Sequence, residues 1–86
     1  MQFEGAVIRE QNVTFAVVIV KKHVVDNRLE ADRAMRAFAP AFPRLPIVLM
    51  AQDRSGRATY FGRRDLSQFM ANQPLHAIPW RRFTLN

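Results

Sequence analysis

The sequence contains no cysteine. This absence excludes disulfide bonds, thiolate catalysis and the usual structural zinc sites, which depend on cysteine ligands. Glycine is also scarce, with three residues in a chain of 86. None of the three belongs to a G-x-G-x-x-G or P-loop pattern, so the sequence predicts no nucleotide-binding loop. We expect neither a cofactor nor a metal.

Long apolar runs are missing as well. No run approaches the roughly 20 residues that a membrane-spanning helix needs. The first ten residues, MQFEGAVIRE, place no basic segment ahead of an apolar one, so no secretory signal is predicted. We therefore expect a cytoplasmic protein with no membrane contact, folded as a single small domain over residues 1–86.

Two short stretches, FAVVIV at 15–20 and IVLMA at 47–51, are apolar at every position. A strand with one face in water alternates instead, so both strands need cover on two faces. One helix on each face would provide that cover. Alternatively, both helices share one face and a second copy covers the other, because a large exposed apolar patch is unusual on a monomer. We favour this homodimer, with self-association through Phe15, Val17, Ile19 and Leu49.

The order of elements is ββαββαβ. Strands are expected at 3–8, 13–25, 47–51, 58–61 and 77–85, and the polar residues 9–12 are expected to form a hairpin loop. One helix is predicted from a cap at Asn27 to just before Pro40, and a shorter one from a cap at Asp65 to about Asn72. Pro79 favours an edge position for the last strand, since proline cannot donate to a ladder. The predicted fold class is α+β: a single mixed five-stranded sheet with two helices packed on it, as a two-layer sandwich.

Residues that carry catalysis in other proteins are isolated here. His23 and His76 have no aspartate or serine arranged around them, and no H-x-x-x-H spacing supports a metal site. Lys21 and Lys22 lack the neighbouring carboxylate that a metal-dependent nuclease would place beside them. The sequence therefore predicts no catalytic residue and favours a protein that is not an enzyme.

The charge is biased towards the C-terminal part of the chain. The net charge is +6, of which residues 53–86 contribute six basic and two acidic side chains. Arginine pairs suit phosphates, and an aromatic ring beside them can stack on an unpaired base. The candidate anion-binding residues are Arg54, Arg57, Arg63, Arg64, Trp80, Arg81 and Arg82. A single phosphate site at residues 62–65, at the start of the second helix, is a more specific form of this anion-binding hypothesis. Asp65 would repel an anion there.

Two functions follow from these observations. The first is a small non-enzymatic interaction or structural module of unknown partner, homodimeric through an apolar sheet face. The alternative is a nucleic-acid-binding module that uses the arginine-rich C-terminal surface. The alternative requires arginines far apart in sequence to converge on one surface, whereas the first allows them to scatter.

Overall fold

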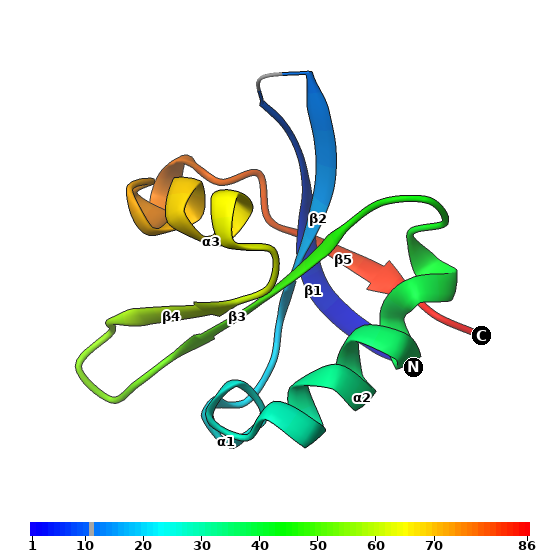
Figure 1. Ribbon diagram of the computed structural model, residues 1–86, viewed down its shortest axis with the longest axis horizontal. Helices are drawn as coiled ribbons and strands as arrows, with labels where there is room; N and C mark the ends of the chain where they lie inside the picture. The colour runs from blue at the N-terminus through cyan, green and yellow to red at the C-terminus, as the bar shows by residue number, and fades with distance from the viewer. Residues whose placement is uncertain (11) are drawn as a thin grey trace.

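The computed structural model describes residues 1–10 and 12–86 and contains one five-stranded sheet in the order β4-β3-β2-β1-β5 (Figure 1). The strands are β1 (Gln2–Glu10), β2 (Val13–Ile19), β3 (Ile47–Gln52), β4 (Ala58–Phe61) and β5 (Arg81–Thr84). Strands β2 and β3 are parallel, and the other three neighbouring pairs are antiparallel. The predicted fold class, α+β with a single mixed five-stranded sheet and two main helices, is confirmed.

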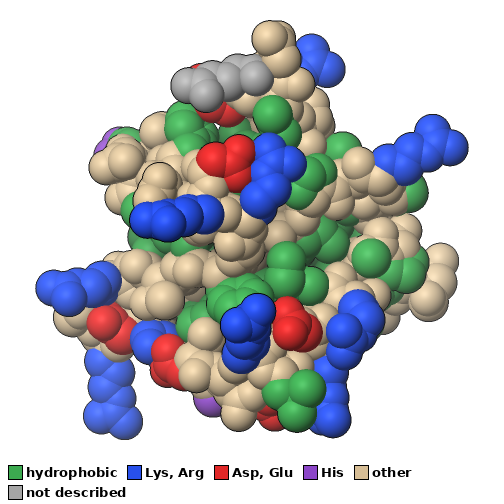
Figure 2. All heavy atoms as spheres, in the orientation of Figure 1, with side chains coloured by type: hydrophobic (Ala, Val, Ile, Leu, Met, Phe, Trp, Pro, Cys, Tyr) green, Lys and Arg blue, Asp and Glu red, His purple; other side chains and the backbone are tan. Residues whose placement is uncertain are grey.

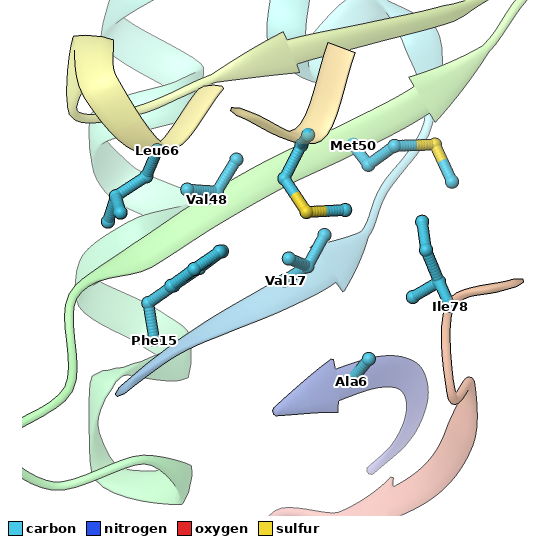
Figure 3. Packing of buried hydrophobic residues seen from close by; sticks show 8 residues of the cluster. Ala6, Phe15, Val17, Val48, Met50, Leu66 and Ile78 are labelled. Carbon is cyan, nitrogen blue, oxygen red and sulfur yellow. The ribbon is translucent and has the colours of Figure 1, made fainter. Parts of the chain in front are cut away.

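The helices are α1 (Lys22–Asp26), α2 (Arg28–Phe38) and α3 (Arg64–Ala71), with 3-10 helices η1 (Ala39–Ala41) and η2 (Leu75–Ala77). Two apolar clusters, one on each face of the sheet, show where they pack. In the first, Leu66 and Met70 of α3 belong to one cluster with Phe15 and Val17 of β2. Figure 3 shows Leu66, Phe15 and Val17 within this cluster. In the second, Ala31 of α2 and Val25 of α1 pack with buried side chains of the opposite parity on β2 and β3. Helices therefore cover both faces of the sheet, which is the first of the two arrangements considered.

The predicted strand at 13–25 is wrong in its second half. β2 ends at Ile19, and residues 22–26 form the short helix α1. Its first turn is closed by an ion pair between Lys22 Nζ and Asp26 Oδ1, 2.6 Å apart, at the i,i+4 spacing that favours helix. Val25 is buried against the α2 side of the sheet. Tertiary burial and the local ion pair thus outweigh the preference of β-branched residues for strand.

The predicted α2 is confirmed at both ends. The side chain of Asn27 accepts a hydrogen bond of 3.1 Å from the Glu30 N–H, which caps the helix start. The helix ends at Phe38, and Pro40 lies in the following 3-10 turn. The predicted cap at Asp65 is wrong, because α3 starts at Arg64 and its N-cap residue is Arg63.

The last strand is shorter than predicted. Residues 75–77 form η2, and β5 begins only at Arg81. Ile78 and Trp80 pack into the cluster beneath α3 as part of the segment that leads into β5. β5 is an edge strand, as Pro79 predicted.

The described residues form a single compact unit. The radius of gyration of the Cα atoms is 11.9 Å, close to the value of about 12 Å expected for one domain of this length. Among the described residues, no helix has the length and apolar character needed to cross a membrane. Residue 11, part of the predicted hairpin loop, lies outside the described residues.

Candidate interaction edges

The candidate arginines lie at two opposite ends of the sheet. Arg54 and Arg57 belong to the β3–β4 hairpin, and Arg63 and Arg64 follow β4 directly. Arg81 and Arg82 lie on β5, at the other edge. In Figure 2, Lys and Arg side chains are distributed around the visible face and do not gather in one patch. Four of the six arginines therefore flank β4 at one edge of the sheet, two before the strand and two after it, and Arg81 and Arg82 lie at the other edge.

The turn between β3 and β4 is held by Asp53. Its Oδ1 accepts hydrogen bonds from the Ser55 hydroxyl at 2.6 Å, the Ser55 N–H at 2.9 Å and the Arg57 N–H at 3.0 Å. The hydrogen bond from the Ser55 hydroxyl, followed by that from the Arg57 N–H, lowers the pKa of Asp53. This carboxylate is thus occupied by its own turn, as its sequence context predicted.

At the start of α3, Arg63 is paired with Asp65. The guanidinium donates to both carboxylate oxygens of Asp65, at 2.8 and 2.9 Å. These hydrogen bonds lower the pKa of Asp65 and raise that of Arg63. Arg63 is therefore engaged within the chain, whereas Arg54, Arg57 and Arg64 form no salt bridge with any described residue.

Trp80 is held by contacts within the chain. Its Nε1–H donates to the Leu75 carbonyl at 3.1 Å, and its ring packs against the cluster beneath α3. It lies beside β5, at the opposite edge of the sheet from Arg54 and Arg57. The structure therefore does not place Trp80 next to the arginines of the β4 end.

The residues predicted for self-association are internal. Phe15 and Val17 are fully buried in the cluster that contacts α3, and Leu49 is fully buried in the cluster that contacts α2. Ile19 is half-buried at the margin of the α3 cluster. A helix as short as α3, with eight residues, was expected to leave this face of the sheet partly exposed. Leu75, Ile78 and Trp80 pack beside α3 and cover the rest of this face. A homodimer remains a prediction, and its contact surface cannot consist of these buried side chains.

The edge of β1 is only half covered. β5 pairs with residues Gln2 to Gly5, which leaves Ala6 to Glu10 open on that side. Met1 and Leu85 exchange two hydrogen bonds, of 2.8 and 2.9 Å. Because bonded and non-bonded pairs alternate in an antiparallel ladder, the backbone groups of odd-numbered residues point towards β5. Those of Val7 and Arg9 therefore point outward, beyond the end of β5.

Proline is the reason that β5 stops. Continuing the register would place Pro79 opposite Val7, and proline has no N–H to donate. The N–H of the preceding ladder position is therefore missing, and the Trp80 N–H bonds locally to the Ile78 carbonyl at 2.8 Å. Pro79 thus removes the donor of the next bonded pair, at the point where the pairing between β5 and β1 ends.

A groove runs beside this open edge. Its volume is about 290 Å³, and its apolar wall comes from α3 and the segment that follows η2, with Phe69, Met70 and Ile78 in that wall. Val7, on the open edge, is one of few large apolar side chains on the surface, with 43% of its area exposed. Ile8 and Val13 of the β1–β2 hairpin, which carries this edge, pack against the cluster beneath α3.

The outer edge of β4 is open as well. The N–H of Asp53 donates to the Arg57 carbonyl at 3.0 Å, so Asp53 and Arg57 form a bonded pair. By the same alternation, the backbone groups of Ala58 and Tyr60 point outward from the sheet. The Tyr60 hydroxyl is buried without a hydrogen-bond partner among the described residues, and burial raises its pKa. At this edge Tyr60 therefore exposes its backbone N–H and C=O groups, whereas its hydroxyl is buried.

The histidines lie on different elements. His23 is on α1, with its Nε2 3.6 Å from a carboxylate oxygen of Glu30, and both side chains are exposed. His76 is in η2, on the other side of the sheet. Within residues 1–10 and 12–86, no group of three His, Cys, Asp or Glu side chains is placed to hold a metal ion.

Sequence reasoning missed the open edge of β1. Its signal was present, because Pro79 marks the point beyond which the last strand cannot pair. Reading that signal required the register between β5 and β1, which only the folded chain supplies.

No protein-family model matches this chain, and no curated protein or solved structure gives a significant match.

Proposed function

We propose that this chain is a non-enzymatic interaction module that self-associates by pairing the open edge of β1 with the same edge of a second copy. The observation that carries this proposal is the length of β1. Nine residues are in strand conformation, but β5 covers only the first part of them. An uncovered strand edge presents unpaired N–H and C=O groups, which form a ready template for another strand.

The open edge is self-complementary in one antiparallel register. Because Val7 and Arg9 carry the outward backbone groups, a two-fold axis at Ile8 pairs Val7 of one copy with Arg9 of the other. Both of these pairs then exchange two hydrogen bonds. Ile8 faces Ile8 of the second copy in a non-bonded pair, where side chains approach most closely. The interface is isologous, as most homodimer interfaces are.

Charge favours this edge over the other one. The exposed part of β1 holds one cation and one anion, Arg9 and Glu10, so its local charge is zero. The outer edge of β4 is flanked by arginines instead. Two chains of net charge +6 repel each other least where the local charges cancel. Repulsion between the more distant charges is screened over about 8 Å at physiological salt.

The test is the oligomeric state of Val7→Pro. The Val7 N–H points outward, so proline at this position blocks edge pairing without removing a β1–β2 hydrogen bond. We expect light scattering to report twice the chain mass of 10.0 kDa for the native protein. The Val7→Pro variant should remain a monomer up to about 300 µM, a range that covers a small interface of weak affinity.

The matched control is Ala58→Pro, which places a proline at the outward position of the β4 edge. This variant should still form the dimer, because β4 takes no part in the proposed contact. Far-UV circular dichroism establishes that both variants fold. A native protein that stays monomeric over the whole concentration range contradicts the proposal, as does a folded Val7→Pro variant that still dimerises.

A further inference from the structure

The outer edge of β4 combines an open backbone with arginines that form no salt bridge with any described residue. Ala58 and Tyr60 direct their backbone N–H and C=O groups outward from the sheet. Arg57 precedes the strand and Arg64 opens the helix that follows it. The open backbone of β4 therefore lies between two arginines of the chain, one before the strand and one after it.

The carboxylates near this edge make their hydrogen bonds to other groups than these two guanidinium groups. Asp53 accepts three hydrogen bonds from Ser55 and Arg57 backbone and hydroxyl groups within its own turn. Asp65 is held in a two-point contact by Arg63. Among the described residues, Arg57 and Arg64 form no salt bridge. Asp53 lies close enough to Arg57 for the two charges to attract each other, but no carboxylate in the described part of the chain holds either guanidinium group in a direct contact.

The edge lacks an exposed aromatic platform for bases. Proteins that bind single-stranded nucleic acids stack the bases on aromatic faces. Here the Tyr60 hydroxyl is buried, and Phe61 packs against the cluster beneath α2. Trp80 lies at the opposite edge of the sheet, bonded to Leu75. The chemistry on offer suits a carboxylate-bearing chain in extended conformation better than a nucleic acid.

We propose that the β4 edge binds an extended acidic segment of a partner polypeptide by strand addition. The segment's backbone pairs with Ala58 and Tyr60, and its carboxylates meet the guanidinium groups of Arg57 and Arg64 at the two ends of the strand. A four-residue strand spans about 13 Å, so carboxylates roughly four to six residues apart along the segment reach both arginines. This surface is at the far end of the sheet from the open edge of β1, so both contacts fit one chain at the same time.

The experiment measures binding of a fluorescently labelled eight-residue peptide of alternating threonine and glutamate by fluorescence anisotropy at low and physiological salt. We expect saturable binding that weakens about tenfold or more in the double variant Arg57→Ala, Arg64→Ala. The matched control is Arg81→Ala, Arg82→Ala, which removes the same charge from the opposite edge and should change affinity less than twofold. Amide hydrogen exchange should show protection of Ala58 and Tyr60 when the peptide binds.

Three results would overturn the proposal of an acidic-segment site on β4. Equal weakening in the two double variants means that the peptide senses only net charge. Tighter binding of a single-stranded oligonucleotide with the same number of negative charges, lost in Arg57→Ala, Arg64→Ala, assigns the surface to nucleic acid. No binding at low salt removes the surface as an acidic-segment site. Repeating the titration on Val7→Pro separates this result from that on the dimer, because binding per chain should be unchanged there.

Discussion

At the scale of single residues, Gly5 stands where the backbone of β2 leaves no room for a side chain. A Cβ atom at this position would lie 2.6 Å from the Val17 carbonyl oxygen and 3.6 Å from the ring of Phe83. Gly5 pairs with β2 on one side and with β5 on the other. Beside it, the Phe3 and Phe83 rings stack with their centroids 5.6 Å apart. The absence of a side chain at Gly5 therefore permits both neighbouring strands to pack at this point.

We expect Gly5→Ala to lower the free energy of unfolding by about 1–3 kcal/mol, the cost typical of forcing an extra methyl group into a packed site. The clash is with backbone, which cannot move aside as a flexible side chain would. Chemical denaturation followed by circular dichroism measures the change. Glu4→Ala, a neighbouring exposed position, should stay within about 0.5 kcal/mol of the native protein. Native-like stability of Gly5→Ala would show that β1 shifts without cost.

At the scale of elements, α2 shows that local chemistry in this chain suffices to set a helix start. Asn27 and Glu30 have the spacing of a capping box, and the bond between the Asn27 side chain and the Glu30 N–H is present at 3.1 Å. The same spacing at Asp65 failed: Asp65 pairs with Arg63, and the N-cap of α3 lies two residues earlier, at Arg63. A capping pattern is thus reliable only where no nearby cation competes for the side chain.

We expect Asn27→Ala to lower the free energy of unfolding by about 1 kcal/mol, because the Glu30 N–H at the exposed helix start loses its partner. Thermal and chemical denaturation both report this change. Asn27→Ser keeps an accepting oxygen and should retain most of the stability. If the serine variant is as unstable as the alanine variant, the helix start depends on a different feature of Asn27 than its capping bond.

At the scale of the whole molecule, the two apolar clusters share the same central strands. β2 contributes Phe15 and Val17 to the cluster beneath α3, and Ala16 and Val18 to the cluster beneath α2. β3 divides its side chains in the same way, with Val48 on the α3 side. Loss of either cluster would expose one face of strands that the other cluster also depends on. The two faces of the molecule therefore stabilise each other.

We expect both faces to unfold in one cooperative transition. Trp80 is the only tryptophan in the sequence and packs on the α3 side, so its fluorescence reports that face. Far-UV circular dichroism reports helices and strands on both sides. The two transitions in denaturant should coincide, as in two-state unfolding of small domains. A fluorescence transition at lower denaturant concentration would show that α3 and its cluster unfold first.

The sequence by itself determined the elements and their chemistry. The runs FAVVIV and IVLMA required cover on two faces, Asn27 and Pro40 bounded α2, and Asp53 built the turn before β4. Each of these depends on residues close together in the chain, where periodicity, capping and turn preferences act. For the same reason the α+β class and the single mixed five-stranded sheet were predicted correctly.

Only the tertiary structure decided which helix covers each face of the sheet and which strands form its edges. It put α2 and α3 on opposite faces, so that the apolar residues predicted for self-association became the core of one chain. It also separated Arg57 and Arg64 from Arg81 and Arg82 by placing β4 and β5 at opposite edges. Strand order and register depend on contacts between residues far apart in sequence, which no local pattern encodes. The open edges of β1 and β4, on which both proposals depend, exist only through that order.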